Sequence, residues 1–179
     1  MMGRLEVICG PMFSGKSEEL LRRVKRAEIG KRPYHLFKPL LDSRYSKDQV
    51  ASHSGIRKDC ITVENYTGIN KVLHLIEPCL VGIDETQFFS AALPNAVGEL
   101  MLRGFRVVVA GLDMDSAGQP FGPLPALMAM ANSVDKLTAV CSVCGSDATH
   151  TYRTSSKSDQ ILVGTSSEYE ARCLTHWVQ

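Results

Sequence analysis

One short motif constrains this chain more than any other feature of its sequence. Residues 10–17 read G-P-M-F-S-G-K-S and satisfy the pattern G-x-x-x-x-G-K-[ST] of a phosphate-binding loop, or P-loop. A segment typical of a short buried strand at 5–9 precedes the motif, and a segment with helical periodicity follows it from 17 to about 29. A strand, a P-loop and a helix in this order predict an α/β fold in which a helix N-terminus faces an anion.

Each fixed position of the motif has a physical task. Gly10 and Gly15 permit the tight turns that point several backbone N–H groups at phosphate oxygens. Lys16 places a compact positive charge on the outer phosphates, and Ser17 offers a hydroxyl to Mg²⁺. We expect the remaining residues of the loop to contact the nucleotide as well, namely Pro11, Met12, Phe13 and Ser14.

Strand-like and helix-like segments alternate along the rest of the chain. The strand-like runs are 33–38, 79–83 and 106–110, and the helix-like segments are 69–76, 91–102 and a stretch that ends near 132. This alternation predicts a parallel sheet with helices on both faces. The polar stretch 42–55 lacks periodicity, and we expect a loop there.

The character of the sequence changes after Asp135. Short strand-like pieces, two cysteine clusters and a Ser/Thr-rich stretch at 154–167 replace the earlier pattern. We therefore predict a P-loop nucleotide-binding domain at 1–134 and a small second domain at 135–179. A unit of about 45 residues usually needs a metal to supplement its core.

Composition argues against several classes of protein. Lys and Arg number 20 against 19 Asp and Glu, so the net charge of +1 gives no general attraction to nucleic acid or an anionic membrane. No window approaches the ~20 apolar residues of a membrane span, and the first residues lack the apolar core of a signal peptide. These observations predict a cytoplasmic protein. The basic residues Arg22, Arg23, Lys25 and Arg26 are interpreted as the solvent-exposed face of a helix.

An acidic pair ends one of the buried strands. Residues 80–85 read L-V-G-I-D-E, and an acid at a neighbouring strand end holds the Mg²⁺ shell in P-loop enzymes. Asp84 is our candidate for that role. If the strand persists, the next side chain points away, so Glu85 is expected to face an acceptor hydroxyl as general base. Asp113, which ends the next strand, is the alternative acid.

Two tight pairs of metal ligands lie in the C-terminal part. Cys141-x-x-Cys144 and Cys173-x-x-His176 offer four ligands, a set typical of a tetrahedral zinc ion. The long segment between the pairs exceeds the span of a compact zinc ribbon, so the ion would hold the base of a loop. His150 is close enough in sequence to replace His176 as the fourth ligand.

In their order and spacing these motifs resemble the zinc-containing cytosolic thymidine kinases. The resemblance extends over nearly the whole chain and includes D-S-R-Y-S at 42–46, I-D-E-T-Q-F-F at 83–89, G-L-D at 111–113, P-F-G at 120–122 and E-Y-E-A-R-C at 168–173. It implies transfer of the ATP γ-phosphoryl group to the 5′-hydroxyl of thymidine or deoxyuridine, in pyrimidine deoxynucleotide salvage. It also implies a RecA-like sheet, a small zinc-containing lasso domain and a homotetramer.

The resemblance also implies roles for individual residues. Glu85 matches the catalytic base, and Asp84 and Ser17 match the Mg²⁺ positions. The nucleotide-contacting set then consists of the P-loop with Asp84, Gln87, Asp42 and Arg44. The nucleoside-contacting set is Met12, Phe88, Leu112, Ser116, Phe121 and Tyr169, with the lasso residues Gln160, Ile161, Leu162, Val163 and Gly164 over the base. Two positions depart from the family pattern: Thr86 replaces a common Gly, and Ser116 replaces an aromatic residue.

Two other classes stay open on the residues alone. One is a different P-loop enzyme, either another nucleoside or nucleotide kinase or a RecA-like ATPase. The other is a zinc-ribbon protein that binds nucleic acid and keeps a non-functional P-loop. The near-neutral charge of this chain and the lack of a patch of aromatic and basic residues in its sequence argue against the second class.

Overall fold

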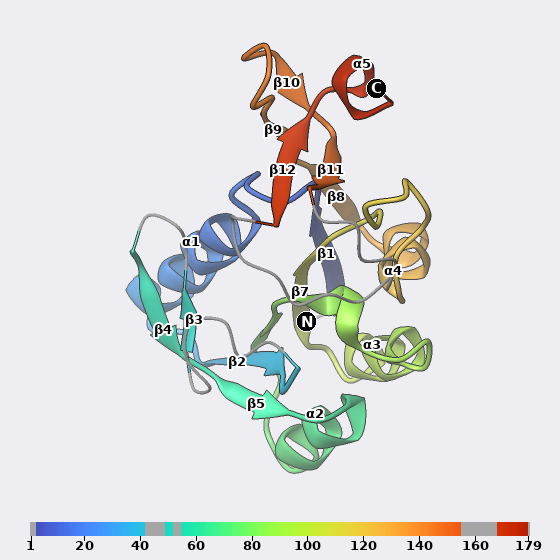
Figure 1. Ribbon diagram of the computed structural model, residues 1–179. Helices are drawn as coiled ribbons and strands as arrows, with labels where there is room; N and C mark the ends of the chain where they lie inside the picture. Colours follow the sequence, from blue (N-terminus) through green and yellow to red (C-terminus); the bar gives the residue numbers. More distant parts are fainter. Residues whose placement is uncertain (1–2, 42–48, 52–54, 155–167, 179) are drawn as a thin grey trace.

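The computed structural model of the chain describes residues 3–41, 49–51, 55–154 and 168–178 (Figure 1). Its centre is a six-stranded sheet in the order β5-β2-β6-β7-β1-β8, in which every paired strand is parallel. The strands are β1 (Arg4–Cys9), β2 (Tyr34–Pro39), β5 (Ile61–Val63), β6 (Leu80–Ile83), β7 (Arg106–Gly111) and β8 (Ser133–Lys136). The predicted parallel α/β fold is thereby confirmed.

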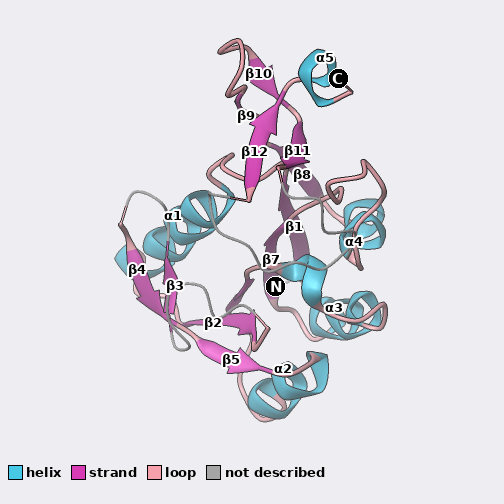
Figure 2. Ribbon diagram, viewed as in Figure 1, coloured by secondary structure: helices cyan, strands magenta, loops and turns pink. Residues whose placement is uncertain are grey.

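Helices cover both faces of this sheet (Figure 2). On one face lies α1 (Lys16–Ile29), and on the other lie α2 (Tyr66–Leu73), α3 (Leu93–Leu102) and α4 (Leu124–Met130). Alternate residues of the central strand β7 belong to the two cores: Val107 and Val109 pack on the side of α2–α4, and Val108 and Ala110 pack against α1. A strand buried on both faces explains the continuous apolar run from which it was predicted.

The C-terminal part forms a smaller unit beyond the ends of β1 and β8 (Figure 1). It contains the antiparallel pair β9 (Ala139–Val140) and β10 (Asp147–Ala148), the antiparallel pair β11 (His150–Arg153) and β12 (Tyr169–Arg172), and the short helix α5 (Leu174–Trp177). Four small buried residues form its core: Ala139, Cys141, Ala148 and Ala171. The boundary at 134/135 stays a prediction, and β8, a strand of the main sheet, crosses it.

The structure corrects two expectations about local structure. Residues 49–51 form β3 (Gln49–Ala51), which pairs with β4 (Arg57–Asp59), where we expected a loop. Only Val50 of β3 is buried, so this polar strand gives no apolar run to detect. Helix α2 begins three residues before the expected start, because the Asn65 side chain accepts a hydrogen bond from the Thr67 N–H at 3.0 Å and caps it. The short helix η1 (Thr86–Phe88) directly follows the acidic pair.

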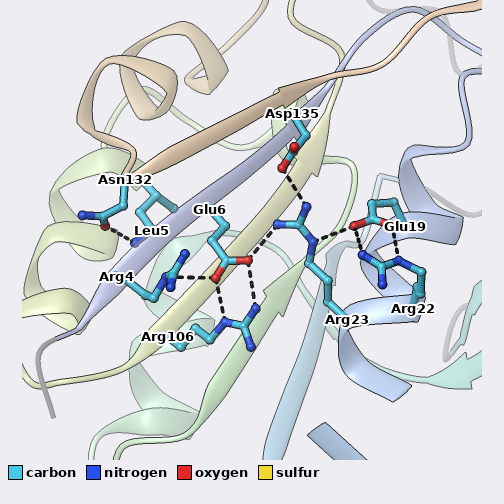
Figure 3. A network of polar contacts seen from close by, with 9 residues as sticks. All are labelled: Arg4, Leu5, Glu6, Glu19, Arg22, Arg23, Arg106, Asn132 and Asp135. Carbon is cyan, nitrogen blue, oxygen red and sulfur yellow. Dashed lines mark hydrogen bonds and ion pairs between the residues drawn. The ribbon is translucent and has the colours of Figure 1, made fainter. Parts of the chain in front are cut away.

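A buried network of ion pairs ties α1 to the sheet (Figure 3). Glu6 of β1 is 3% exposed, and its carboxylate accepts hydrogen bonds from Arg23 Nη1 at 2.7 Å and from Arg106 Nε at 2.7 Å. Arg4 pairs with the same carboxylate at 3.0 Å, and Arg23 also reaches Asp135 of β8 at 2.7 Å. The charges therefore join β1, β7, β8 and α1 around one acid.

This network overturns part of the interpretation of the basic cluster. Arg22, Lys25 and Arg26 are exposed, as expected. Arg23 is buried, because its position on α1 faces the sheet and Glu6 offers a buried partner there. The helical period alone could not distinguish an arginine on the wet face from one that pairs with a buried acid.

The network yields a stability prediction. Burial alone would raise the pKa of Glu6, but the hydrogen bond and charge of Arg106, with Arg4 and Arg23, hold that pKa below its ordinary value. We expect Glu6→Gln to lower the free energy of unfolding at pH 7 by about 2 kcal/mol, less than for a fully buried pair because Arg4 and Arg106 are partly exposed.

The pH dependence of this loss follows from the direction of the pKa shift. A lowered folded-state pKa stabilises the protein above the unfolded pKa of about 4.3, and the contribution is lost as the pH falls through the folded value. Urea titrations from pH 7 down to about pH 3 should therefore show the two proteins converging at the acid end. Glu28→Gln, which removes a surface partner of Lys58, is the control. Equal losses in the two variants, or a loss that does not depend on pH, would contradict the prediction.

Candidate active site

The P-loop connects the end of β1 to the start of α1. Gly10 and Gly15 have φ of 139° and 81°, and Phe13 adopts the left-handed region at 66°. A Cβ at Gly10 would lie 2.3 Å from the Leu137 carbonyl oxygen, so only glycine fits beside the segment after β8. The Glu19 N–H donates to the Gly15 carbonyl at 2.9 Å and begins the helix.

The lysine of the motif lies over the loop. Lys16 Nζ donates to the Pro11 carbonyl oxygen at 2.5 Å and to Ser14 Oγ at 3.4 Å, and Ser14 Oγ donates to the same carbonyl at 2.8 Å. Ser17 follows in the first turn of α1. A cation and the positive end of a helix dipole therefore lie at one place, which is a favourable arrangement for binding phosphate.

Asp84 is buried just beyond the end of β6. Its backbone N–H donates to the Phe37 carbonyl at 2.9 Å, and its Oδ1 accepts a hydrogen bond from the Glu85 N–H at 3.0 Å. Strand β6 is not the direct neighbour of β1, because β7 lies between them. The carboxyl ends of parallel strands share one edge, so Asp84 and the P-loop lie on the same edge of the sheet with one strand between them.

Glu85 has a backbone conformation that non-glycine residues rarely adopt. Its φ is 49°, in the left-handed region. This conformation costs on the order of 1–3 kcal/mol and persists only where the surrounding structure holds it. Strand β6 ends at Ile83, so the alternation of strand side chains that we expected to separate Glu85 from Asp84 does not apply. The turn into η1 aims the Glu85 side chain instead.

Gln87 holds the Glu85 carboxylate. Its Nε2 donates to Glu85 Oε2 at 2.6 Å, and its Oε1 accepts from the Leu112 N–H at 3.0 Å. The amide is buried and crosses from the end of β6 to the end of β7. A Cβ at Gly111 would lie 2.6 Å from Gln87 Oε1, and one at Gly122 would lie 2.2 Å from the Gln87 carbonyl oxygen. Both glycines are thus required by the close approach of Gln87.

Asp113, the alternative acid, has a different partner. Its Oδ2 lies 2.7 Å from Lys136 Nζ, at the end of β8, and its hydrogen bond raises the pKa of that lysine. The carboxylate of Asp113 therefore pairs with a cation, and that of Glu85 accepts a hydrogen bond from the Gln87 amide.

Two predicted nucleoside-contacting residues meet beside this edge of the sheet. The rings of Phe88 and Phe121 contact edge to face, with centroids 5.9 Å apart and an interplanar angle of 87°. The Phe121 N–H donates to the Asp113 carbonyl at 3.0 Å, which ties the second ring to the end of β7. Leu112 is half-buried immediately after that strand.

The other predicted pocket residues are more dispersed. Ser116 lies in a turn whose Asp115 carboxylate accepts from the Ala117 and Gln119 N–H groups, each at 2.9 Å. Tyr169 is buried at the start of β12, and its hydroxyl accepts from Arg153 Nη2 at 3.0 Å. Asp42, Arg44, Gln160, Ile161, Leu162, Val163 and Gly164 lie outside the residues that the structure describes.

The four predicted metal ligands come together. The Sγ atoms of Cys144 and Cys173 are 3.8 Å apart, and His176 Nδ1 lies 3.7 Å from Cys141 Sγ and 3.1 Å from Cys173 Sγ. All four ligand atoms lie within 4.8 Å of one another. Tetrahedral bonds of about 2.3 Å place two sulfur atoms about 3.8 Å apart, so the spacing fits one tetrahedral ion.

The electrostatics of the cluster also suit a metal. Backbone hydrogen bonds, first from Cys173, lower the pKa of Cys141 to about 5, which favours the thiolate that a metal requires. His150 is not part of the cluster. Its Nδ1 lies 2.9 Å from Thr149 Oγ1, and its ring stacks on Trp177 with centroids 4.6 Å apart.

The small C-terminal unit touches the P-loop directly, a contact that no motif in the sequence predicts. The Met12 N–H donates to Thr151 Oγ1 at 3.0 Å, and Phe13 packs against the small core around Cys141. Lys136 and Trp177 are two further residues that sequence reasoning missed. No motif marks such pairs, since each joins residues far apart in the chain.

These features define a P-loop α/β protein whose C-terminal unit carries a cluster of three cysteines and one histidine. A family model for thymidine kinase matches residues 3–177. The chain therefore belongs to the thymidine kinase family, which consists of ATP-dependent phosphotransferases. Within the described ranges, no helix combines the length and the apolarity that crossing a bilayer requires.

Proposed function

We propose that this chain transfers the γ-phosphoryl group of ATP to the 5′-hydroxyl of thymidine or deoxyuridine. One observation carries the proposal: Lys16 of the P-loop and the Gln87-held Glu85 lie on the same edge of one parallel sheet. Phosphoryl transfer needs a cationic cradle for the phosphates and a positioned base for the acceptor, and these residues supply both. Family membership supports the same reaction.

The phosphates of ATP are proposed to bind at the P-loop. Backbone N–H groups of residues 13–17 bind their oxygens, and Lys16 neutralises the charge that develops on the transferred group. Ser17 and Asp84 would hold Mg²⁺, which supplies further positive charge to the phosphate oxygens. Asp42 and Arg44 are proposed to lie near the same phosphates.

Glu85 is the proposed general base. Its carboxylate takes the proton of the 5′-hydroxyl as that oxygen forms a bond to the γ-phosphorus, and the bond to the β-phosphate oxygen breaks to release ADP. The Gln87 amide positions the carboxylate through the contact at 2.6 Å. Gln87, which the family resemblance placed in the nucleotide-contacting set, is thus proposed to position the catalytic base.

The nucleoside is proposed to lie between the phenylalanine pair and the C-terminal unit. Phe88 and Phe121 offer aromatic surface, and we propose that Met12 and Leu112 flank it. Ser116 and Tyr169 complete the described part of the wall. The residues 160–164 are proposed to close over the base through main-chain groups.

We also propose that the cysteine–histidine cluster binds one Zn²⁺ per chain. Purified protein should contain one equivalent of zinc by elemental analysis, and Cys141→Ser should lose it, because three ligands hold the ion far less tightly. Cys60→Ser removes a half-buried thiol outside the cluster and should keep the zinc. Active wild-type protein without zinc, or a Cys141→Ser protein with a full equivalent, would contradict the assignment.

A panel of acceptors tests the proposed reaction. Purified protein with Mg–ATP is assayed side by side with thymidine, deoxyuridine, deoxycytidine and deoxyguanosine. The proposal requires that kcat/KM be highest for the first two. A preference for deoxycytidine or deoxyguanosine would indicate another nucleoside kinase, and ATP hydrolysis without any acceptor would indicate an ATPase.

Assembly and location are further proposals that the family resemblance supports. We propose a homotetramer, which sedimentation equilibrium of the full chain can test. We propose a cytoplasmic location, which agrees with the lack of a disulfide among the six cysteines, all of which lie in the described ranges.

A further inference from the structure

The C-terminal helix packs its one tryptophan against a turn of the main domain. The Trp177 indole Nε1–H donates to the Ser116 carbonyl oxygen at 3.3 Å, although the two residues are 61 positions apart. A Cβ at Gly118 would lie 2.8 Å from Trp177 Cη2, so the ring rests directly on this glycine. Trp177 is the single tryptophan of the sequence.

The turn beneath the indole is internally well ordered. The Asp115 N–H donates to the Gln119 carbonyl at 2.9 Å, the Gly118 N–H donates to the Asp115 carbonyl at 3.1 Å, and Met114 bridges to Pro120. Strand β7 ends at Gly111, and the turn that follows Leu112 returns at Phe121. It therefore carries the ring that contacts Phe88.

The other side of the indole is anchored to the metal-ligating unit. Trp177 directly follows the cluster member His176, and the N–H groups of both residues donate to the Cys173 carbonyl, at 3.0 Å and 3.1 Å respectively. Arg172 Nη1 donates to the His176 carbonyl at 3.0 Å. The His150 ring stacks on the indole with centroids 4.6 Å apart and an interplanar angle of 30°. The indole is thus held from the cluster and from β11.

We propose that Trp177 is a positioning residue that fixes the turn 113–121 to the metal-ligating unit and thereby raises the affinity for the nucleoside. The proposal rests on the proposed function in one respect, namely that Phe121 and Leu112 contact the nucleoside. A turn held in its binding conformation loses less conformational freedom when the ligand binds. Loss of the indole contact frees the turn without touching Lys16 or Glu85.

Two substitutions separate the parts of this contact. Trp177→Phe keeps an aromatic ring against Gly118 and His150 but removes the N–H donor, and Trp177→Leu removes the ring as well. We expect KM for thymidine to rise about two- to threefold in the first variant and about three- to tenfold in the second. KM for ATP and kcat should stay within about twofold of the wild type, because the contact does not reach the P-loop.

A purely structural role would not split the two KM values in this way. The exposed neighbour Val178 provides the matched control, and Val178→Ala should leave both KM values unchanged. Zinc content of each variant, by elemental analysis, shows whether the cluster survives. The proposal would be overturned if Val178→Ala raised KM for thymidine as much as the Trp177 variants do. It would also be overturned if KM for ATP rose as much as KM for thymidine in the Trp177 variants.

Hydrogen exchange tests the contact without any reference to turnover. Peptides covering 112–122 should exchange faster in Trp177→Leu than in the wild type, and peptides covering β1 should not change. Unchanged exchange at 112–122 would overturn the proposal even if KM had risen. If the wild type failed to phosphorylate thymidine while 112–122 still exchanged faster in the variant, the proposed function would fail and the fixing of the turn by Trp177 would stand.

The single tryptophan also provides an optical readout. Indole emission of the wild type should shift to longer wavelength when a chelator removes the metal, because α5 and its tryptophan then leave the turn for water. Saturating thymidine should oppose that shift. It binds more tightly to the conformation in which the indole lies on the turn, and it therefore stabilises that conformation. Emission that does not respond to the chelator would show that the cluster does not hold the indole on the turn.

Discussion

Lys16→Ala should remove nearly all turnover while leaving the fold intact. The Lys16 ammonium lies on the P-loop carbonyl of Pro11 at the positive end of α1, where no second motif lysine can replace it. Loss of one preorganised group that stabilises developing charge costs on the order of 10²–10³ in kcat. Because this lysine also binds the ground-state phosphates, the loss in kcat/KM should be about 10³ or more.

The matched control is Lys25→Ala, which removes an exposed lysine from the same helix. Steady-state rates with Mg–ATP and thymidine and thermal unfolding curves are measured for both variants and the wild type. We expect Lys25→Ala to behave as the wild type in both measurements. Turnover near that of the wild type in a folded Lys16→Ala protein would remove the P-loop from the mechanism.

Glu85→Gln should lower kcat by about 10²–10⁴ with little change in the Kd for ATP. Glutamine keeps the shape of the side chain, and its amide oxygen can still accept the hydrogen bond from Gln87. It cannot accept the proton of the 5′-hydroxyl. The effect should therefore appear in the chemical step. Single-turnover rates measure that step, and equilibrium titration with Mg–ATP measures the binding.

Asp113→Asn and Glu99→Gln complete the comparison. The first removes the alternative acid, which pairs with Lys136, and the second removes an exposed carboxylate on α3. We expect kcat to fall far more in Glu85→Gln than in Asp113→Asn, and to be unchanged in Glu99→Gln. A sharp rise in the Kd for ATP with nearly unchanged kcat in Glu85→Gln would place Glu85 in the metal shell and make Asp113 the candidate base.

Sequence reasoning predicted the elements whose evidence is local. Strands β6 and β7 are buried on both faces and so appear as continuous apolar runs, and β1 shows the same pattern except at the buried Glu6. Strand β8 was missed because most of its residues are exposed or half-buried and its stability comes from pairing with β1. The order of the strands is a tertiary property, so the sequence could not tell that β7 separates the P-loop strand from that of Asp84.

The same division holds for the candidate site. The P-loop and the metal cluster depend on close spacing, and both are found where their motifs predicted them. The left-handed conformation of Glu85 and the bridging position of Gln87 depend on Gly111 and Gly122, which approach only in the folded state. The distant contact of Trp177 with Ser116 likewise leaves no trace in the sequence pattern.

The central claim is the transfer of a phosphoryl group from ATP to the 5′ oxygen of thymidine by Glu85 and Lys16. It is tested most directly by following γ-labelled ATP and thymidine with the purified full chain and identifying the products by ³¹P NMR. We expect ADP and thymidine 5′-monophosphate in equal amounts, with the label on the 5′ oxygen, and neither product above background in Lys16→Ala. Label released as inorganic phosphate at a rate independent of thymidine, or carried on the 3′ oxygen, would contradict the claim.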